Sequence, residues 1–311
     1  MGKFLYGILK TARPRQWLKN IAVGTAVLFT GQIFTDKLLI TFWAFLAFCL
    51  FSSSGYFIND ILDAERDRKH PFKKFRPIAS GRLSVPVALF VSFLCLIIGL
   101  SISFQLGKPF LLISISFILL QYAYSFFLKH ISVIDILTIT TAYFLRVYAG
   151  EAATGYHISI WLALAVLSLA LFLAIGKRRA ELTLIQGYAG VVPKDTRETL
   201  SHYSEKLLDT YTAMFANSTF ITYAFYTFLE KPIIKGFFFR GYGEFSEPLA
   251  DRKWMMVTIP FVLFGIMRYM QLIYEGKGES PEQLLTKDLP LLTTVLLWGF
   301  TVFIVIYGIG G

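Results

Sequence analysis

Nine long apolar runs, separated by short polar segments, dominate the chain. Each run is close to the roughly 20 residues that a helix needs to cross the hydrocarbon core of a membrane. We therefore predict an all-α polytopic membrane protein, a bundle of about nine transmembrane helices, with residues 1–311 forming a single domain. The predicted spans are 16–35, 38–58, 84–106, 109–128, 131–150, 157–176, 207–229, 253–274 and 289–309.

The composition agrees with this pattern. Hydrophobic residues make up 55% of the chain, and the mean hydropathy is +0.59, far above that of a soluble domain. The two cysteines, Cys49 and Cys95, lie in apolar runs and are expected to be buried packing residues. Residues 1–20 are basic and amphipathic, which favours an interfacial helix over a cleaved signal peptide.

The positive charges predict an orientation. Segment 59–83 carries seven Lys and Arg residues and segment 177–206 carries six, so both are expected to be cytoplasmic loops of an inner-membrane protein. The loop at 230–253 breaks the pattern with five cations of its own, and its role stays open. The net charge of +10 does not indicate a nucleic-acid partner, because the cations lie beside membrane spans. They suit anionic lipid headgroups and phosphorylated substrates.

The segment NDILDAERDRKHPFKKFRPIASG, residues 59–81, separates an acidic block from a basic one. In a helix Asp60, Asp63 and Asp67 stand at i, i+3 and i+7, which places them within roughly 60° of one another on one face. Carboxylates gathered in this way repel one another unless a cation lies among them. Hard oxygen ligands favour Mg²⁺, which takes its remaining ligands from water and a phosphorylated substrate.

The basic half of the segment suits phosphate oxygens. Arg76 offers a bidentate fork and Lys73 a point charge. The alternative interpretation is a solvated loop of mixed charge between two spans. Against it stands the separation of acid from base into two blocks, which is unusual for a loop.

A second group of polar residues lies between 122 and 151. Tyr122 and Lys129 precede Asp135, and Arg146 and Glu151 follow it inside an apolar run. An ionisable group within a membrane costs several kcal/mol unless it is paired or wetted, so such residues usually mark a functional cavity. A structural ion pair between Arg146 and an acid on another helix is the alternative.

Two basic motifs border other spans. In GKRRAEL, residues 176–182, at least one of Lys177 and Arg178 is expected to reach substrate phosphate if a site lies there; positive-inside anchoring is the alternative. In RPRQWLKN, residues 13–20, Arg13 and Arg15 are interpreted as headgroup anchors, whereas Lys19 and Asn20 are candidates for the cavity.

Together, the block NDxxDxxxD with HPxKxxRPIASG, RPRQWLKN, the stretch from Tyr122 to Gly155 and GKRRAEL resemble the UbiA superfamily of intramembrane prenyltransferases. The resemblance implies nine helices around a cavity that opens to the cytoplasm and sideways to lipid. It also implies Mg²⁺-dependent transfer of 5-phosphoribose from phosphoribosyl diphosphate to a polyprenyl phosphate of the decaprenyl type. Many members carry a second DxxxD motif, where this chain has Asp135 followed by Ile139. A standard second metal cluster is therefore in doubt.

The residue roles follow from this interpretation. Asp60, Asp63 and Asp67 are the predicted metal ligands and catalytic residues, with Asp135 as a further catalytic candidate. The predicted substrate-binding residues are Lys19, Asn59, Lys73, Arg76, Tyr122, Lys129, Arg146, Glu151, Lys177 and Arg178. The predicted partners are phosphoribosyl diphosphate, polyprenyl phosphate and membrane lipids. The sequence leaves open the oligomeric state, a homo-oligomer included.

Two rival functions remain. An aromatic prenyltransferase of the same superfamily would use the same acids with a prenyl diphosphate as the electrophile. The many Lys and Arg residues on the predicted cytoplasmic side favour a substrate that presents more phosphate groups on the water side of the membrane. A transporter or lipid flippase is disfavoured, because the ionisable residues cluster at one face and do not trace a path across the bilayer.

Overall fold

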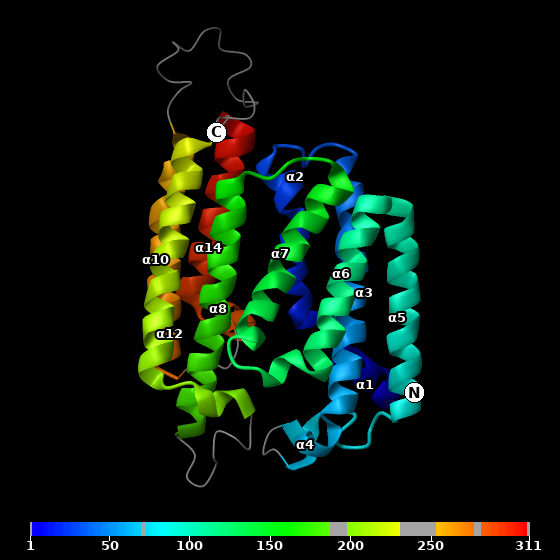
Figure 1. Ribbon diagram of the computed structural model, residues 1–311. Helices are drawn as coiled ribbons and strands as arrows, with labels where there is room; N and C mark the ends of the chain where they lie inside the picture. Colours follow the sequence, from blue (N-terminus) through cyan, green and yellow to red (C-terminus); the bar gives the residue numbers. More distant parts are fainter. Residues whose placement is uncertain (1, 70–72, 187–197, 231–252, 277–280, 310–311) are drawn as a thin grey trace, which may run out of the picture. The chain divides into compact units, whose positions relative to one another are not determined.

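The computed structural model describes residues 2–69, 73–186, 198–230, 253–276 and 281–309, and these form helices and connecting turns without a strand (Figure 1). The helices from residue 2 to residue 154 are α1 (Gly2–Ala12), the 3₁₀ helix η1 (Pro14–Gly24), α2 (Thr25–Phe29), α3 (Lys37–Leu62), α4 (Ala64–Lys69), η2 (Lys73–Phe75), α5 (Val85–Leu106), α6 (Lys108–Phe126), η3 (Leu128–His130) and α7 (Ile134–Thr154). The later ones are α8 (Ile160–Gln186), η4 (Glu198–His202), α10 (Glu205–Leu229), η6 (Trp254–Thr258), α12 (Ile259–Tyr274), α13 (Pro281–Lys287), α14 (Leu289–Phe303) and the π-helical turn η7 (Ile304–Ile309).

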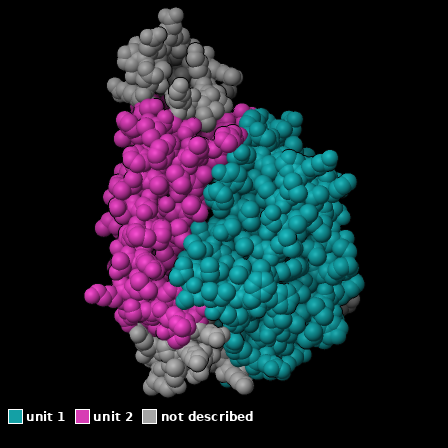
Figure 2. Space-filling model, viewed as in Figure 1, with its two compact units in different colours: residues 1–27, 35–156 teal, residues 28–34, 157–311 magenta. Residues whose placement is uncertain are grey.

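The chain divides into two compact units, coloured separately in Figure 2. Unit 1 comprises Met1–Val27 and Thr35–Tyr156, and unit 2 comprises Leu28–Phe34 and His157–Gly311. This division does not test whether the chain folds as one domain, so the single-domain prediction stays a prediction.

Eight of the nine predicted spans coincide with long helices among the described residues. Six helical segments are long and apolar enough to cross a membrane: Lys37–Leu62, Val85–Leu106, Lys108–Phe126, Ile160–Thr183, Trp254–Tyr274 and Leu289–Ile309. Helices α7 and α10 are as long but more polar. Helix α7 carries Asp135, Arg146 and Glu151 along its 21 residues, and α10 begins with charged residues.

The first predicted span is wrong in its detail. Residues 16–35 do not form one transmembrane helix, because the 3₁₀ helix η1 and the five-residue α2 occupy most of this range. The physical reason for this difference is that the first part of the run carries polar side chains that need partners within the protein. Asn20 is fully buried, and Trp17 donates a hydrogen bond to Ser53 on α3 at 3.0 Å. These side chains pair with neighbouring helices, which a lipid-facing span cannot do.

Aromatic packing holds α3 against its neighbours in unit 1. The ring of Phe48 lies 4.7 Å from that of Phe117 on α6 and 5.9 Å from that of Phe51. A Cβ on Gly99 of α5 would lie only 2.5 Å from the Phe51 ring, so α5 approaches α3 where a glycine leaves room. This close contact lies on α3, the helix whose last turn carries Asp60.

Unit 2 is built in the same manner from α8, α10, α12 and α14. A Cβ on Gly176 would meet the Ile273 side chain at 2.6 Å and the Tyr269 ring at 2.9 Å, so α8 and α12 also pack through a glycine. Elsewhere in this unit the Trp298 indole donates a hydrogen bond of 2.8 Å to the Tyr223 hydroxyl. That hydroxyl lies 2.6 Å from the Thr258 hydroxyl.

Candidate active site

The acidic block forms where α3 ends and α4 begins. Asp60 lies in the last turn of α3, Asp63 is the residue between the helices, and Asp67 lies on α4. The path remains helical across the junction, because the Asp63 N–H donates to the Asn59 carbonyl at 2.9 Å and the Asp67 N–H to the Asp63 carbonyl at 2.8 Å. The three carboxylates therefore follow one another along a nearly continuous helical path.

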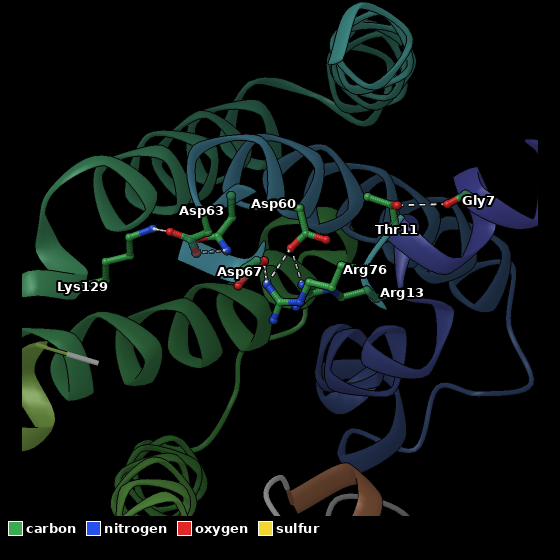
Figure 3. A network of polar contacts seen from close by, with 9 residues as sticks. Gly7, Thr11, Arg13, Asp60, Asp63, Asp67, Arg76 and Lys129 are labelled. Atoms are coloured by element: carbon green, nitrogen blue, oxygen red, sulfur yellow. Dashed lines mark hydrogen bonds and ion pairs between the residues drawn. The ribbon is translucent and has the colours of Figure 1, made fainter. Parts of the chain in front are cut away.

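Two arginines, one before and one after the acidic block in the chain, contact the buried carboxylates. Arg13, directly before η1, donates through Nη2 to Asp60 Oδ1 at 2.5 Å. Arg76, directly after η2, donates through Nη1 to the same Asp60 oxygen at 3.1 Å and to Asp67 Oδ2 at 2.7 Å. Figure 3 shows both guanidinium groups converging on Asp60. One nitrogen of Arg76 thus joins two carboxylates on successive helices.

A lysine forms the other part of the site. Lys129, in the η3 turn between α6 and α7, donates to Asp63 Oδ1 at 2.7 Å and to Asn59 Oδ1 at 3.3 Å. The Asn59 amide in turn donates to Asp63 Oδ2 at 3.0 Å. Lys129 and Asp63 are drawn together at one end of the network in Figure 3. The predicted residues Asn59, Asp63 and Lys129 therefore contact one another.

Burial makes the carboxylates dependent on these cations. Only 2% of Asp60 and 3% of Asp67 is exposed to solvent. Burial raises the pKa of the Asp67 carboxyl above its usual value; the positive charge of Arg76 opposes this shift, and the nearby Asp60 adds to it. An ionised, buried carboxylate is stable only beside a cation, whether a protein side chain or a metal ion.

Arg13 is the site residue that sequence reasoning missed. Interpreted there as a headgroup anchor, it instead adopts a left-handed backbone conformation, with φ 54° and ψ 61°, and points to Asp60. Its guanidinium also lies 5.0 Å from the Tyr56 ring. The one sequence signal is Pro14, because a residue before proline is disfavoured in the right-handed helical region. That signal predicts a turn but gives no partner for the side chain.

The other predicted residues of unit 1 lie along the helices. The Tyr122 hydroxyl lies 2.9 Å from that of Ser54 on α3. Arg146 donates to Asn20 on η1 at 2.6 Å. Asp135 is fully buried in the first turn of α7. Lys19, Lys73 and Glu151 are partly buried.

The GKRRAEL motif lies in unit 2. Arg178 is fully buried and donates to Glu181 at 2.7 Å, and Lys177 is partly buried. The neighbouring Arg179 binds Asp209 at 2.7 Å and Glu205 at 3.0 Å. Contact of Lys177 and Arg178 with the substrate stays a prediction. His70 lies outside the described residues, as does most of the loop at 230–253.

Comparison with known proteins shows the family of this chain. The UbiA prenyltransferase family pattern matches residues 20–180, more than half of the chain. The chain belongs to the UbiA prenyltransferase family. Its relatives include proteins named decaprenyl-phosphate phosphoribosyltransferase. The one from Corynebacterium glutamicum is 33% identical over 308 residues, 97% of this chain and 87% of the relative. The one from Mycolicibacterium smegmatis is 33% identical over 310 residues, 97% and 92% of the two chains.

A solved structure confirms the fold of this UbiA-family protein. A UbiA homologue from Archaeoglobus fulgidus, bound to DMAPP and Mg²⁺, matches it with a TM-score of 0.69. The match covers 96% of this chain and 98% of that one at 21% identity. The predicted all-α polytopic membrane fold and the resemblance to UbiA proteins are thus both confirmed, and the protein is a multi-pass integral membrane protein.

The donor set of this UbiA-family site fits Mg²⁺ in chemistry. Asp60, Asp63 and Asp67 supply the hard carboxylate oxygens that Mg²⁺ prefers. Within the described residues, no three His, Cys, Asp or Glu side chains come together as one metal-binding group. The guanidinium of Arg76 instead lies between Asp60 and Asp67. The three carboxylates thus match Mg²⁺ in ligand type, while in this structure Asp60 and Asp67 are paired by the side chain of Arg76.

Proposed function

We propose that this protein transfers 5-phosphoribose from phosphoribosyl diphosphate to a polyprenyl phosphate of the decaprenyl type and releases diphosphate. The names of the relatives that match almost the whole chain support this reaction. The observation that carries it is the cluster of three carboxylates with Arg13, Arg76 and Lys129 at the end of α3. Such a set of cations suits a donor with a diphosphate and a 5-phosphate group.

In this proposal the carboxylates orient the cations. Asp60 holds the guanidinium groups of both arginines, so that their remaining N–H groups are directed at phosphate oxygens. Lys129, held by Asp63 and Asn59, provides a point charge for the diphosphate or the 5-phosphate. Asn59 also suits a hydroxyl of the ribose. Phosphate binding then requires little rearrangement, because the donors are already fixed.

The reaction breaks the bond between ribose C1 and the diphosphate oxygen, and the electron pair leaves with diphosphate. An oxygen of the lipid phosphate forms the new bond to C1. This nucleophile is already anionic at neutral pH, so the site needs no general base. When bound, Mg²⁺ would neutralise the charge that develops on the diphosphate, and Asp60, Asp63 and Asp67 are the residues that would hold it. Arg13 and Arg76 would stabilise the same charge through hydrogen bonds.

The proposal includes a side of the membrane. Segment 59–83 carries seven Lys and Arg residues, so the positive-inside rule predicts that it lies in the cytoplasm. The water-soluble donor then reaches the site from the cytoplasm, and the lipid acceptor reaches it from the bilayer. The product would be a lipid-linked sugar phosphate for synthesis of the cell envelope.

The test is a transfer assay on purified protein. Labelled phosphoribosyl diphosphate, polyprenyl phosphate and Mg²⁺ are incubated in detergent, and the lipid is extracted into organic solvent. The proposal expects label in the lipid phase, and none after addition of EDTA. Label that stays in the water phase, from a folded and lipid-supplied preparation, would refute it. Prenyl diphosphate with aromatic acceptors would then test the aromatic prenyltransferase alternative. Transfer of label in this assay, which has no gradient, would also exclude a transporter.

A further inference from the structure

The segment that carries Arg13 into the site has an unusual backbone. Helix η1 runs for 11 residues, Pro14–Gly24, as a 3₁₀ helix. Runs of more than three or four residues are uncommon, because the hydrogen bonds of a 3₁₀ helix are poorly aligned. Such a segment needs contacts with the rest of the protein to keep its conformation. Side chains of α3 and α7 supply these contacts.

The main contact is a buried polar pair. Asn20 of η1 is fully buried and Arg146 of α7 is 4% exposed. Arg146 donates through Nε to Asn20 Oδ1 at 2.6 Å and through Nη1 to the Ala142 carbonyl at 2.8 Å. The Arg146 guanidinium also lies 4.7 Å from the Phe117 ring and 5.4 Å from the Tyr143 ring. The arginine is thus fixed from several sides, and Asn20 binds to a rigid donor.

Helix α3 holds Asn20 from its other side. The Ser52 hydroxyl donates to Asn20 Oδ1 and the Asn20 amide donates to Cys49 Sγ, both at 3.3 Å. Farther along, η1 lies directly on α7, since a Cβ on Gly150 would stand only 2.0 Å from the Val23 carbonyl oxygen. Helix η1 is therefore clamped between α3 and α7.

A second contact fixes the beginning of η1. The Ser53 hydroxyl of α3 accepts a hydrogen bond from the Trp17 indole at 3.0 Å and donates one to the Ala12 carbonyl at 3.1 Å. These two partners flank Arg13, which has the left-handed backbone conformation. Through these contacts the position of Arg13 depends on how η1 is seated.

We propose that Asn20 and Arg146 are positioning residues, which seat η1 between α3 and α7 so that Arg13 reaches Asp60 and the phosphorylated donor. This role rests on the proposed function for its kinetic consequence. It differs from the substrate contact predicted for Arg146 from sequence. Neither residue needs to touch the donor; each acts through Arg13.

A double-mutant cycle tests the proposal. Asn20→Leu keeps the size of the side chain but removes its acceptor, and Asn20→Asp keeps the acceptor. We expect Asn20→Leu to raise the KM for phosphoribosyl diphosphate by about tenfold, with a smaller change in kcat and in the KM for the lipid. Asn20→Asp should keep the KM for phosphoribosyl diphosphate close to that of the wild type. In an Arg13→Gln background, Asn20→Leu should have no further effect. Independent, multiplying effects of the two changes would overturn the proposal.

A second readout does not depend on turnover. In a Cys95→Ala background, Cys49 is the remaining thiol, and it is buried beside Asn20. Maleimide should label it slowly in the parent and several-fold faster in Asn20→Leu and Arg146→Met. Ser114→Ala is the matched control, because it removes an equally buried hydrogen bond between α5 and α6. Equal labelling in all variants would refute the clamp.

These readouts separate the two proposals. If the wild type transfers no label from phosphoribosyl diphosphate, the proposed function fails while the thiol assay still tests the clamp. If Asn20→Leu does not fold, Ser53→Ala provides a milder change at the other end of η1. It should raise the KM for the donor in the same direction, and an unchanged KM would contradict the positioning role.

Discussion

Arg76 bridges two carboxylates, and its replacement is expected to change both stability and donor binding. Arg76→Met removes the guanidinium that bonds both Asp60 and Asp67 and keeps the length of the side chain. Asp60 retains Arg13, whereas Asp67 loses its bridging cation. Both carboxylates are almost fully buried, so the change leaves negative charge without compensation at the junction of α3 and α4.

The expected loss of stability in Arg76→Met depends on how deeply the ion pair is buried. Removing one partner of a fully buried ion pair costs about 3–5 kcal/mol of stability. The Arg76 side chain is 25% exposed, so water offsets part of this loss, and we expect about 1–3 kcal/mol. For catalysis, loss of one hydrogen bond to a charged phosphate oxygen corresponds to about a 10- to 100-fold rise in the KM for phosphoribosyl diphosphate.

The assay measures thermal stability and the KM for both substrates in Arg76→Met, Arg76→Lys and Arg82→Gln. Arg82 is exposed in the same cation-rich segment, so Arg82→Gln controls for loss of charge alone and should behave as wild type. Arg76→Lys keeps the charge but not the fork and should be intermediate. An unchanged KM for the donor in Arg76→Met, or an equal rise in the KM for the lipid, would place the donor phosphates elsewhere.

Three further predictions test the site and the packing. Asp60→Asn should abolish transfer, because it removes the carboxylate shared by Arg13 and Arg76; near-wild-type rates with an unchanged Mg²⁺ dependence would contradict its role. Lys129→Met should raise the KM for phosphoribosyl diphosphate by about tenfold through loss of a charged hydrogen bond, and saturation curves for the two substrates measure this; a changed KM for the lipid alone would assign Lys129 to the acceptor. Gly176→Ala should lower stability by about 1–3 kcal/mol through overpacking, as its Cβ would meet α12 at 2.6 Å. Gly265→Ala, whose Cβ meets nothing within 4 Å, is the control in the same thermal unfolding measurement, and equal loss in both would refute the packing argument.

The sequence predicted those features that depend on local order. Apolar runs of nearly constant length predicted eight long helices, because a membrane span is set by length and hydropathy. The spacing of Asp60, Asp63 and Asp67 predicted one acidic face; in the structure Arg76 contacts Asp60 and Asp67, whereas Asp63 pairs with Lys129. Lys129, which was predicted to bind substrate, forms an ion pair with Asp63, and its contact with substrate stays a prediction.

What the sequence did not reveal depends on contacts between distant segments. Arg13 lies 47 residues from Asp60, and Asn20 lies 126 residues from Arg146. No local sequence pattern predicts a contact between residues that lie so far apart in the chain. The run 16–35 was predicted to span because its average hydropathy is high, yet the buried amide of Asn20 decides its conformation. A single polar group that must find a partner outweighs the preference of its neighbours for a regular α-helix.

The order of the cluster along the chain bears on how the protein is made. The members of the ion pairs in the cluster, from Arg13 through Asp60, Asp63, Asp67 and Arg76 to Lys129, all belong to the first 129 residues and to unit 1. Because a chain is synthesised and folds from its amino terminus, these ion pairs have all their members in place while residues 130–311 are still to be added. Early pairing would prevent exposure of unpaired charged side chains to lipid while the chain inserts into the membrane.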